Sequence, residues 1–192
     1  MAAIQELIEN LASLDARARE SAAREIYRAG ADLAESVIRH WRKDSELALL
    51  LCDAPPIVGV AVRPENFVRI RRVMGFPALA EVPPDQDARE FEVRLGGVSL
   101  DILTVRSPDG PPGAISRFLE KFGEGIQQVE YLVSDLDSAT ELLRGRFGLS
   151  PIFPAARAGA NNTRVNFFLP GTPDGKRVLI ELVESPPEDD AA

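Results

Sequence analysis

The sequence predicts an α+β fold in which a strand–helix–strand pattern occurs twice after an all-helical segment. A strand at 57–62, IVGVAV, and a strand at 127–133, QQVEYLV, each precede a stretch with helical spacing of apolar residues. Each half then continues with further strands, which include VSLDILTV at 98–105 and RVLIELVE at 177–184. The offset of about 70 to 80 residues between the halves indicates an internal repeat.

Residues 1–53 are predicted to be helical, because apolar residues recur there at helical spacing. Asp15 is suited to cap a helix that is expected to end at Gly30. A further apolar helical face follows, made of Leu33, Val37, Ile38 and Trp41. This face must be covered either by the rest of the chain or by a second chain, and we favour a homodimer.

The segment boundaries follow from composition. Pro55 and Pro56 separate the helical segment from the repeat, which spans 57–184. The last residues, 185–192, are acidic and proline-rich, which predicts a disordered tail.

Composition excludes several classes of function. The net charge of −8 argues against a nucleic-acid partner, because such domains concentrate Lys and Arg. No apolar run approaches the roughly 18 to 20 residues that span a bilayer, so no membrane association is expected. The N-terminus lacks the pattern of a secretory signal, and we therefore expect a cytoplasmic location.

The alternation of side chains along the predicted strands places polar residues on one face of the sheet. They are Glu90, Glu92, Arg94, Asp101, Gln128, Glu130, Arg164, Asn166 and Glu181. The same face carries apolar residues such as Ile57, Phe168 and Leu179. A face of this kind is either simply solvated, as in many antiparallel sheets, or the wall of a small-molecule site.

The run GAISRFLEKFGEGIQQVEYLVSDLDSATELL, at 113–143, resembles the vicinal-oxygen-chelate (glyoxalase/bleomycin-resistance) superfamily. It is most similar to the methylmalonyl-CoA epimerase branch, which reads roughly FLEK-x-GEG-x-HHIAF at this point. The resemblance implies two tandem βαβββ modules, 57–105 and 127–184, that form one cupped mixed sheet. It also implies a small organic molecule as the ligand of the cup.

The resemblance further implies four metal-ligand positions, which match Ile57, Asp101, Gln128 and Glu181 in this chain. Both histidines that the family places among them are replaced. The chain's one histidine, His40, belongs to the helical segment. Zn, Co and Ni favour imidazole, so we expect no such cofactor. The remaining oxygens, of Asp101, Gln128 and Glu181, suit at most a weakly held Mg²⁺ or Ca²⁺.

Three functions remain open at this stage. The first is a glyoxalase-like binding protein with a degenerate metal site, whose pocket includes Ile57, Glu92, Arg94, Arg164, Asn166 and Phe168. The second is an isomerase or lyase that abstracts a proton beside a carbonyl, with Glu130 and Glu181 as bases. In that case Arg94 or Arg164 would neutralise the developing charge, although cross-strand ion pairs are the favoured explanation of all four residues. The third is an assembly subunit.

Overall fold

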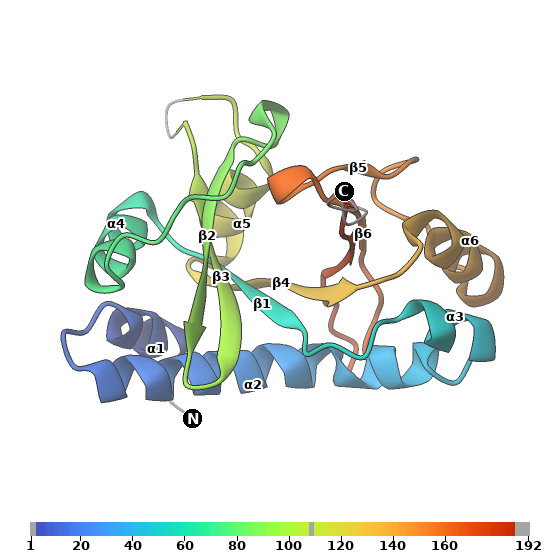
Figure 1. The fold of residues 1–192 in the computed structure, drawn as a ribbon, viewed down its shortest axis with the longest axis horizontal. Helices are drawn as coiled ribbons and strands as arrows, with labels where there is room; N and C mark the ends of the chain where they lie inside the picture. The colour runs from blue at the N-terminus through green and yellow to red at the C-terminus, as the bar shows by residue number, and fades with distance from the viewer. Residues whose placement is uncertain (1–2, 108–109, 187–192) are drawn as a thin grey trace, which may run out of the picture.

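In the computed structural model, which describes residues 3–107 and 110–186, a helical segment precedes a mixed sheet (Figure 1). The helices are α1 (Ile4–Leu11), α2 (Ala16–Trp41), α3 (Ser45–Leu50), α4 (Pro64–Val73), α5 (Ala114–Phe122) and α6 (Leu136–Phe147). The strands are β1 (Ile57–Ala61), β2 (Ala88–Leu95), β3 (Val98–Val105), β4 (Gly125–Leu132), β5 (Arg157–Ala158), β6 (Arg164–Phe168) and β7 (Ile180–Glu184). Of the tail predicted at 185–192, residues 187–192 lie outside the described residues.

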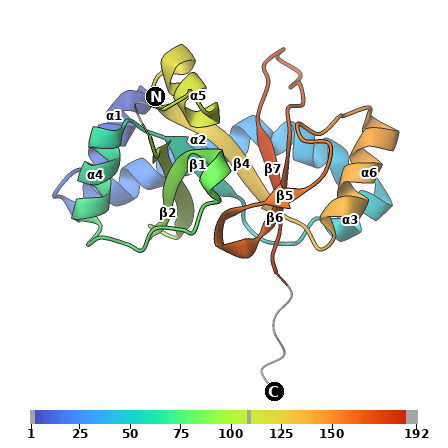
Figure 2. The ribbon, with the colours of Figure 1, turned by 90° about the horizontal axis from the view of Figure 1, so that it is seen from above.

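The strands of the described residues form one curled, seven-stranded sheet in the order β2-β3-β1-β4-β7-β6-β5 (Figure 2). The first strands of the two modules, β1 and β4, lie antiparallel at its middle. Each has the last strand of its own module as its other neighbour, in the parallel pairs β1–β3 and β4–β7. The predicted α+β fold with a cupped mixed sheet is therefore confirmed. The first module differs in detail, because two described strands rather than three follow its helix.

One long helix, α2, replaces the two helices that the sequence predicted. Asp15 caps it as expected, by accepting a hydrogen bond from the backbone N–H of Arg17 at 2.9 Å. The helix continues through Gly30, so the predicted end at this residue is wrong. Gly30 instead allows close approach, since a Cβ there would lie 2.6 Å from Cγ1 of Val58 on β1. The residue thus marks a helix–sheet contact rather than a helix terminus.

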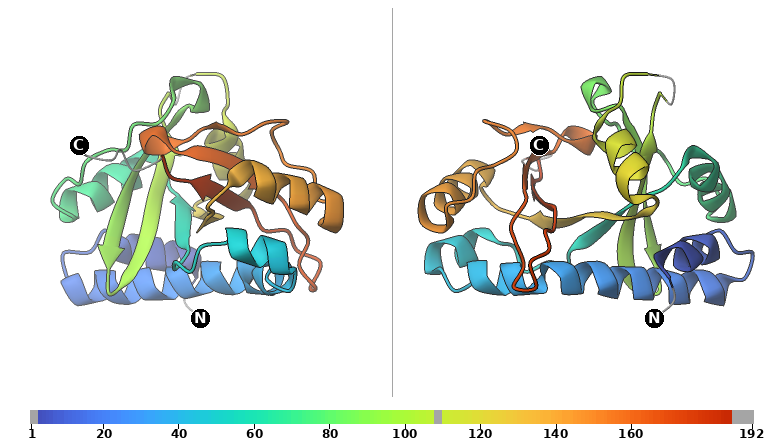
Figure 3. Two further views of the ribbon diagram at one scale, coloured as in Figure 1. Left: turned by 45° about the vertical axis from the view of Figure 1, so that its right-hand side comes forward. Right: turned by 180° about the vertical axis from the view of Figure 1, so that it is seen from behind.

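The helical segment contacts both modules. Figure 1 and both views of Figure 3 show α2 running along the base of the molecule beneath the sheet. At one end α1 packs near α4, where Glu9 forms an ion pair with Arg69 at 2.9 Å. At the other end α3 packs against α6, where Arg146 contacts Asp44 at 2.6 Å. Ion pairs at the surface are screened by solvent and contribute little, so apolar packing supplies most of the attachment.

The main core joins the helices to the outer face of the sheet. Val37, Ile38 and Trp41 of α2 are buried in one cluster with the apolar residues of β1, β3, β4 and β7. The apolar face that favoured a homodimer is therefore largely covered within the chain, and the oligomeric state stays a prediction. In the described part of the chain, no helix is long and apolar enough to cross a membrane.

Candidate functional site

A cavity of about 780 Å³ lies on the inner face of the sheet, opposite α2. Its floor consists of residues from β1, β2, β3, β4 and β7, and β6 supplies a wall. Residues between 77 and 86, between 113 and 117 at the start of α5, and between 152 and 163 also line it. Ligand sites for small organic molecules typically measure about 300–1,000 Å³, so the cavity has a suitable size.

The centre of the floor is a row across three strands. In the sheet register, Gly59 of β1 lies between Asp101 of β3 and Gln128 of β4. A Cβ at Gly59 would lie 2.6 Å from Cγ of Gln128 and 3.1 Å from Cδ1 of Leu103. The glycine therefore leaves the space that the neighbouring side chains of the floor occupy.

A second row places two carboxyl groups side by side. Glu130 of β4 pairs with Glu181 of β7 on one side and with Ile57 of β1 on the other. Glu181 is only 8% exposed. Its carboxylate accepts a hydrogen bond from the side-chain amide of Gln128. The two rows thus join at Gln128 and Glu181.

The acidic groups of the floor have raised pKa values. Burial raises the pKa of Glu90 to about 7. Burial and the neighbouring charges of Glu130 and Glu90 raise the pKa of Asp101 well above its usual range. The pKa of Glu130 is raised by burial and by Glu90 and Glu92, and that of Glu181 by burial and then Glu130. These groups can therefore exchange protons nearer to neutral pH than ordinary carboxyls do.

Most of the residues predicted for the site line this cavity. They are Ile57, Glu92, Asp101, Gln128, Glu130 and Glu181. Arg94 was expected in the pocket, but it is not among the lining residues. Its side chain is 82% exposed and its Nε lies 2.9 Å from a carboxylate oxygen of Glu92. Both residues belong to β2, so this is a surface ion pair within one strand and not the cross-strand pair that was the alternative interpretation of Arg94.

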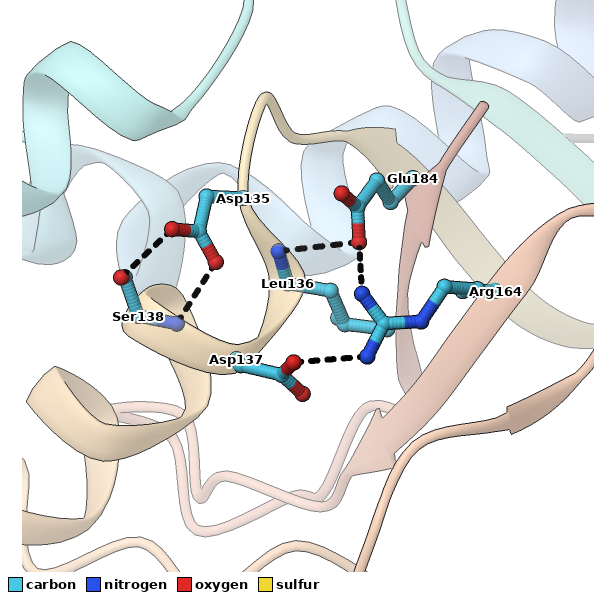
Figure 4. A network of polar contacts seen from close by, with 6 residues as sticks. All are labelled: Asp135, Leu136, Asp137, Ser138, Arg164 and Glu184. Atoms are coloured by element: carbon cyan, nitrogen blue, oxygen red, sulfur yellow. Dashed lines mark hydrogen bonds and ion pairs between the residues drawn. The ribbon is translucent and has the colours of Figure 1, made fainter. Parts of the chain in front are cut away.

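The face of β6 that was expected to line the cup points away from it. Val165 and Phe167 line the cavity, whereas Arg164, Asn166 and Phe168 do not. Arg164 lies on the α6 side, where its guanidinium contacts Asp137 and Glu184 at 2.7 and 2.6 Å (Figure 4).

The other two residues of this face are fully buried outside the cavity. The side-chain amide of Asn166 donates to the carbonyl oxygen of Phe153 at 3.2 Å. The ring of Phe168 packs edge-on against Trp41 of α2, with centroids 6.3 Å apart. Neither Arg94 nor Arg164, the two candidates for neutralising charge on a ligand, lines the cavity.

The cavity wall contains an aromatic pair that the sequence did not predict. The rings of Phe153 and Phe167 meet edge to face, with centroids 5.9 Å apart. Both residues line the cavity. Alternation predicts Phe167 on the face opposite to Asn166, away from the cup, and Phe153 lies in a loop whose sequence carries no signal for its position.

Two loops meet at the mouth of the cavity in a contact that we call the clasp, residues 81–86 and 157–161. The backbone N–H of Glu81 donates to Oδ1 of Asn161 at 3.0 Å, and the N–H of Asn161 donates to the carbonyl of Glu81 at 3.1 Å. Arg157 forms an ion pair with Asp85. The side chain of Gln86 donates to the carbonyl of Ala158 at 2.7 Å. The clasp links the two modules above the floor.

The four positions that the resemblance assigns to a metal do not fit an imidazole-bound transition metal. Gln128 and Glu181 are in contact, and Asp101 lies in the same row as Gln128, but Ile57 presents only carbon. Within residues 3–107 and 110–186, no group of three or more His, Cys, Asp or Glu is placed to hold a metal ion. The floor offers oxygen atoms alone, which Zn, Co and Ni favour less than nitrogen or sulfur.

No family model matches the sequence, and no curated protein matches it. Solved structures do. The chain is 32% identical to methylmalonyl-CoA epimerase from Mycobacterium tuberculosis over 71% of this chain and 90% of that one, with a TM-score of 0.55.

Two structures with bound ligands share the fold at lower identity. A methylmalonyl-CoA epimerase in complex with methylmalonyl-CoA and NH4+ is 24% identical, with 72% and 96% of the two chains covered and a TM-score of 0.54. A Streptomyces coelicolor methylmalonyl-CoA epimerase variant in complex with 2-nitronate-propionyl-CoA is also 24% identical, with 68% and 93% covered and a TM-score of 0.53. With the sheet topology and the first match, these findings place the chain in the family of the methylmalonyl-CoA epimerases, within the vicinal-oxygen-chelate superfamily.

Proposed function

We propose that the chain binds a small organic molecule in the cup of its sheet, at a degenerate metal site that holds no first-row transition metal. The observation that carries this proposal is the 780 Å³ cavity, whose floor combines buried and half-buried carboxyl groups with an alkyl side chain, that of Ile57, at a family ligand position. Two structures of the same fold contain CoA-type ligands, which supports a small-molecule role for the cup.

The site chemistry supports binding without a tightly held metal. Asp101 and Glu181 are hard oxygen donors, and the amide oxygen of Gln128 is a weak neutral one. In the structure that amide donates its N–H to Glu181, so both groups already have a partner. Mg²⁺ or Ca²⁺ would bind weakly to such a set, with water completing the coordination.

The metal part of the proposal is tested by elemental analysis of protein purified without a metal-affinity tag. We expect less than about 0.1 equivalents of Zn, Co, Ni or Mn, because no imidazole is available in the cup. A stoichiometric content of any of these metals would contradict the proposal.

Binding in the cup is tested by a fragment screen with ligand-observed NMR, repeated on Leu179→Trp. Leu179 lines the cavity beside Glu181, so an indole at this position should obstruct the part of the cavity above the floor. We expect hits that bind the unmodified protein and lose affinity for the variant, whose folding is checked by circular dichroism. If no fragment of any charge distinguishes the two proteins, the cup is not a binding site.

A second candidate function is epimerase or lyase chemistry by proton abstraction beside a carbonyl. Glu130 and Glu181 favour it, because both line the cavity and both have pKa values shifted toward those of a general base. The test is deuterium incorporation at C2 of methylmalonyl-CoA in D₂O, with and without added Co²⁺. Exchange that is catalysed by the protein and lost in Glu130→Gln or Glu181→Gln would favour this candidate over binding alone.

A further inference from the structure

The floor of the cavity carries carboxyl groups that no neighbouring cation in the described part of the chain compensates. Four carboxyl groups line it that belong to no ion pair among the described residues: Glu90, Asp101, Glu130 and Glu181. The two arginines that line the cavity are engaged at its mouth. Arg157 pairs with Asp85, and Arg117 donates to the carbonyl of Pro112 at 2.9 Å.

Such a floor discriminates strongly by the sign of a ligand's charge. Like charges within a few ångströms in a partly desolvated site repel one another, and an opposite charge placed among them is attracted. A ligand carboxylate would add to this repulsion, whereas a ligand cation would relieve it.

The arrangement suits an organic cation better than a metal ion. A metal needs several donors within about 2–2.6 Å of one point. The described carboxyls do not form such a group, although they surround one cavity. An ammonium group is larger, donates several hydrogen bonds in different directions, and carries a carbon chain. Ile57 and Leu179 offer apolar surface to that chain.

The cavity wall provides an independent sign of cation recognition. Phe167 pairs in register with Glu181, so its ring stands beside the acidic floor. Its partner ring, Phe153, already has a cation over its face, because Cζ of Arg157 lies 4.5 Å from the ring centroid. Aromatic rings next to carboxylates are the usual surroundings of bound ammonium groups in proteins.

We infer, on the basis of the proposed binding function, that the buried end of the ligand is a positively charged nitrogen held by the carboxyls of the floor and the ring of Phe167. The ammonium lies over the row of Glu130 and Glu181, and its carbon chain runs along Ile57 and Leu179 toward the mouth. The ligand is thus an amine or quaternary ammonium compound.

Three probes with a common phenylalkyl skeleton test the inference: 4-phenylbutylamine, 4-phenylbutan-1-ol and 4-phenylbutyrate. Titration by calorimetry at pH 8 is expected to show the amine binding at least about tenfold more tightly than the alcohol, and the carboxylate more weakly still. An amine that binds no more tightly than the alcohol overturns the inference.

Two variants assign the preference to the floor and the ring. Glu90→Gln combined with Glu130→Gln should reduce amine affinity about tenfold or more and leave alcohol affinity nearly unchanged. The matched control removes two exposed acids that do not line the cavity, Glu65→Gln with Glu141→Gln, and should change neither. Phe167→Leu should weaken the amine several-fold more than the alcohol.

Different results would contradict this inference and the proposed binding function on which it rests. If neutral or anionic probes bind the unmodified protein but not Leu179→Trp, the cup is a binding site, and the inference that its ligand is a cation is wrong. Equal amine affinity for the floor variant and the control would likewise overturn the role of the carboxyls. Only the absence of any binding that depends on the cup, in the fragment screen, would remove the proposed function itself.

Discussion

The side-chain amide of Gln128 donates a hydrogen bond to the carboxylate of Glu181, from one strand of the second module to its parallel neighbour. Two of the four positions that resemble a metal site are therefore in contact although neither carries an imidazole. Their contact implies that nitrogen donors introduced nearby would meet a carboxylate already in place.

Replacing both residues that lack a strong metal donor, as in Ile57→His with Gln128→His, should create a transition-metal site. We expect a gain of at least about tenfold in Co²⁺ or Ni²⁺ affinity by titration calorimetry, because two imidazoles join the carboxylates of Asp101 and Glu181. The control, Leu14→His with Leu49→His, adds two histidines at exposed positions away from the cup. No gain over this control in a folded variant would mean that the four positions do not converge.

Glu90→Gln should stabilise the protein in a manner that depends on pH. Burial raises the folded-state pKa of Glu90 from 4.5 to about 7, so the folded state binds the proton more tightly than the unfolded state. Below about pH 4.5 the group is protonated in both states and does not change the free energy of unfolding. As the pH rises to 7 and above, its ionisation disfavours folding by up to about 3 kcal/mol.

The variant should therefore have the larger free energy of unfolding at pH 8, and its advantage should shrink as the pH falls toward 5. Urea unfolding at pH 8, 6.5 and 5 measures this trend. The exposed Glu65→Gln should show a small difference at every pH. A benefit of Glu90→Gln that grows on acidification would contradict the assigned direction of the shift.

Gly30→Ala should destabilise the contact between α2 and β1. The added methyl would lie 2.6 Å from Cγ1 of Val58, and the clash should cost about 1–3 kcal/mol, partly offset by about 1 kcal/mol of helix propensity. Chemical denaturation measures the net loss. The double variant with Val58→Ala should show favourable coupling, because it removes the methyl groups that clash.

A glycine of α6 provides the comparison for this prediction. Nothing lies within 4 Å of a Cβ added to Gly145, so Gly145→Ala should gain up to about 1 kcal/mol from helix propensity alone. If both glycine variants are equally stable, α2 does not approach β1 as closely as described.

Asn161→Gly should loosen the clasp without distorting its backbone. Asn161 has a φ of 51°, which glycine adopts readily, so the substitution removes mainly the side-chain oxygen that accepts from Glu81. Amide hydrogen exchange around residue 81 should accelerate about three-fold to tenfold, consistent with the loss of about 1 kcal/mol from one hydrogen bond. Asn162→Gly, at a φ of 62°, is the matched control. Equal exchange in the two variants would argue against the clasp.

The sequence predicted the floor of the cup well because its strands alternate clearly. In β4 and β7, mostly apolar residues alternate with Gln128, Glu130 and Glu181, so one face could be assigned without the structure. In β6 both faces carry aromatic residues, and the polar residues were assigned to the cup.

The structure gives those polar residues partners that local sequence could not reveal. Arg164 meets Asp137 of α6, and Asn166 meets the backbone of Phe153. The length of α2 was not predicted, for a similar reason. Gly30 resembles a helix end in sequence, and only the position of Val58 explains it as a packing site.

A helix that both modules share makes them interdependent during unfolding. α2 packs against β2 and β3 of the first module and against β4 of the second, on either side of its contact with β1. Neither module can lose its structure without exposing part of this helix to water, so a partly unfolded intermediate would be costly. The internal duplication thus forms a single cooperative folding unit instead of two autonomous ones.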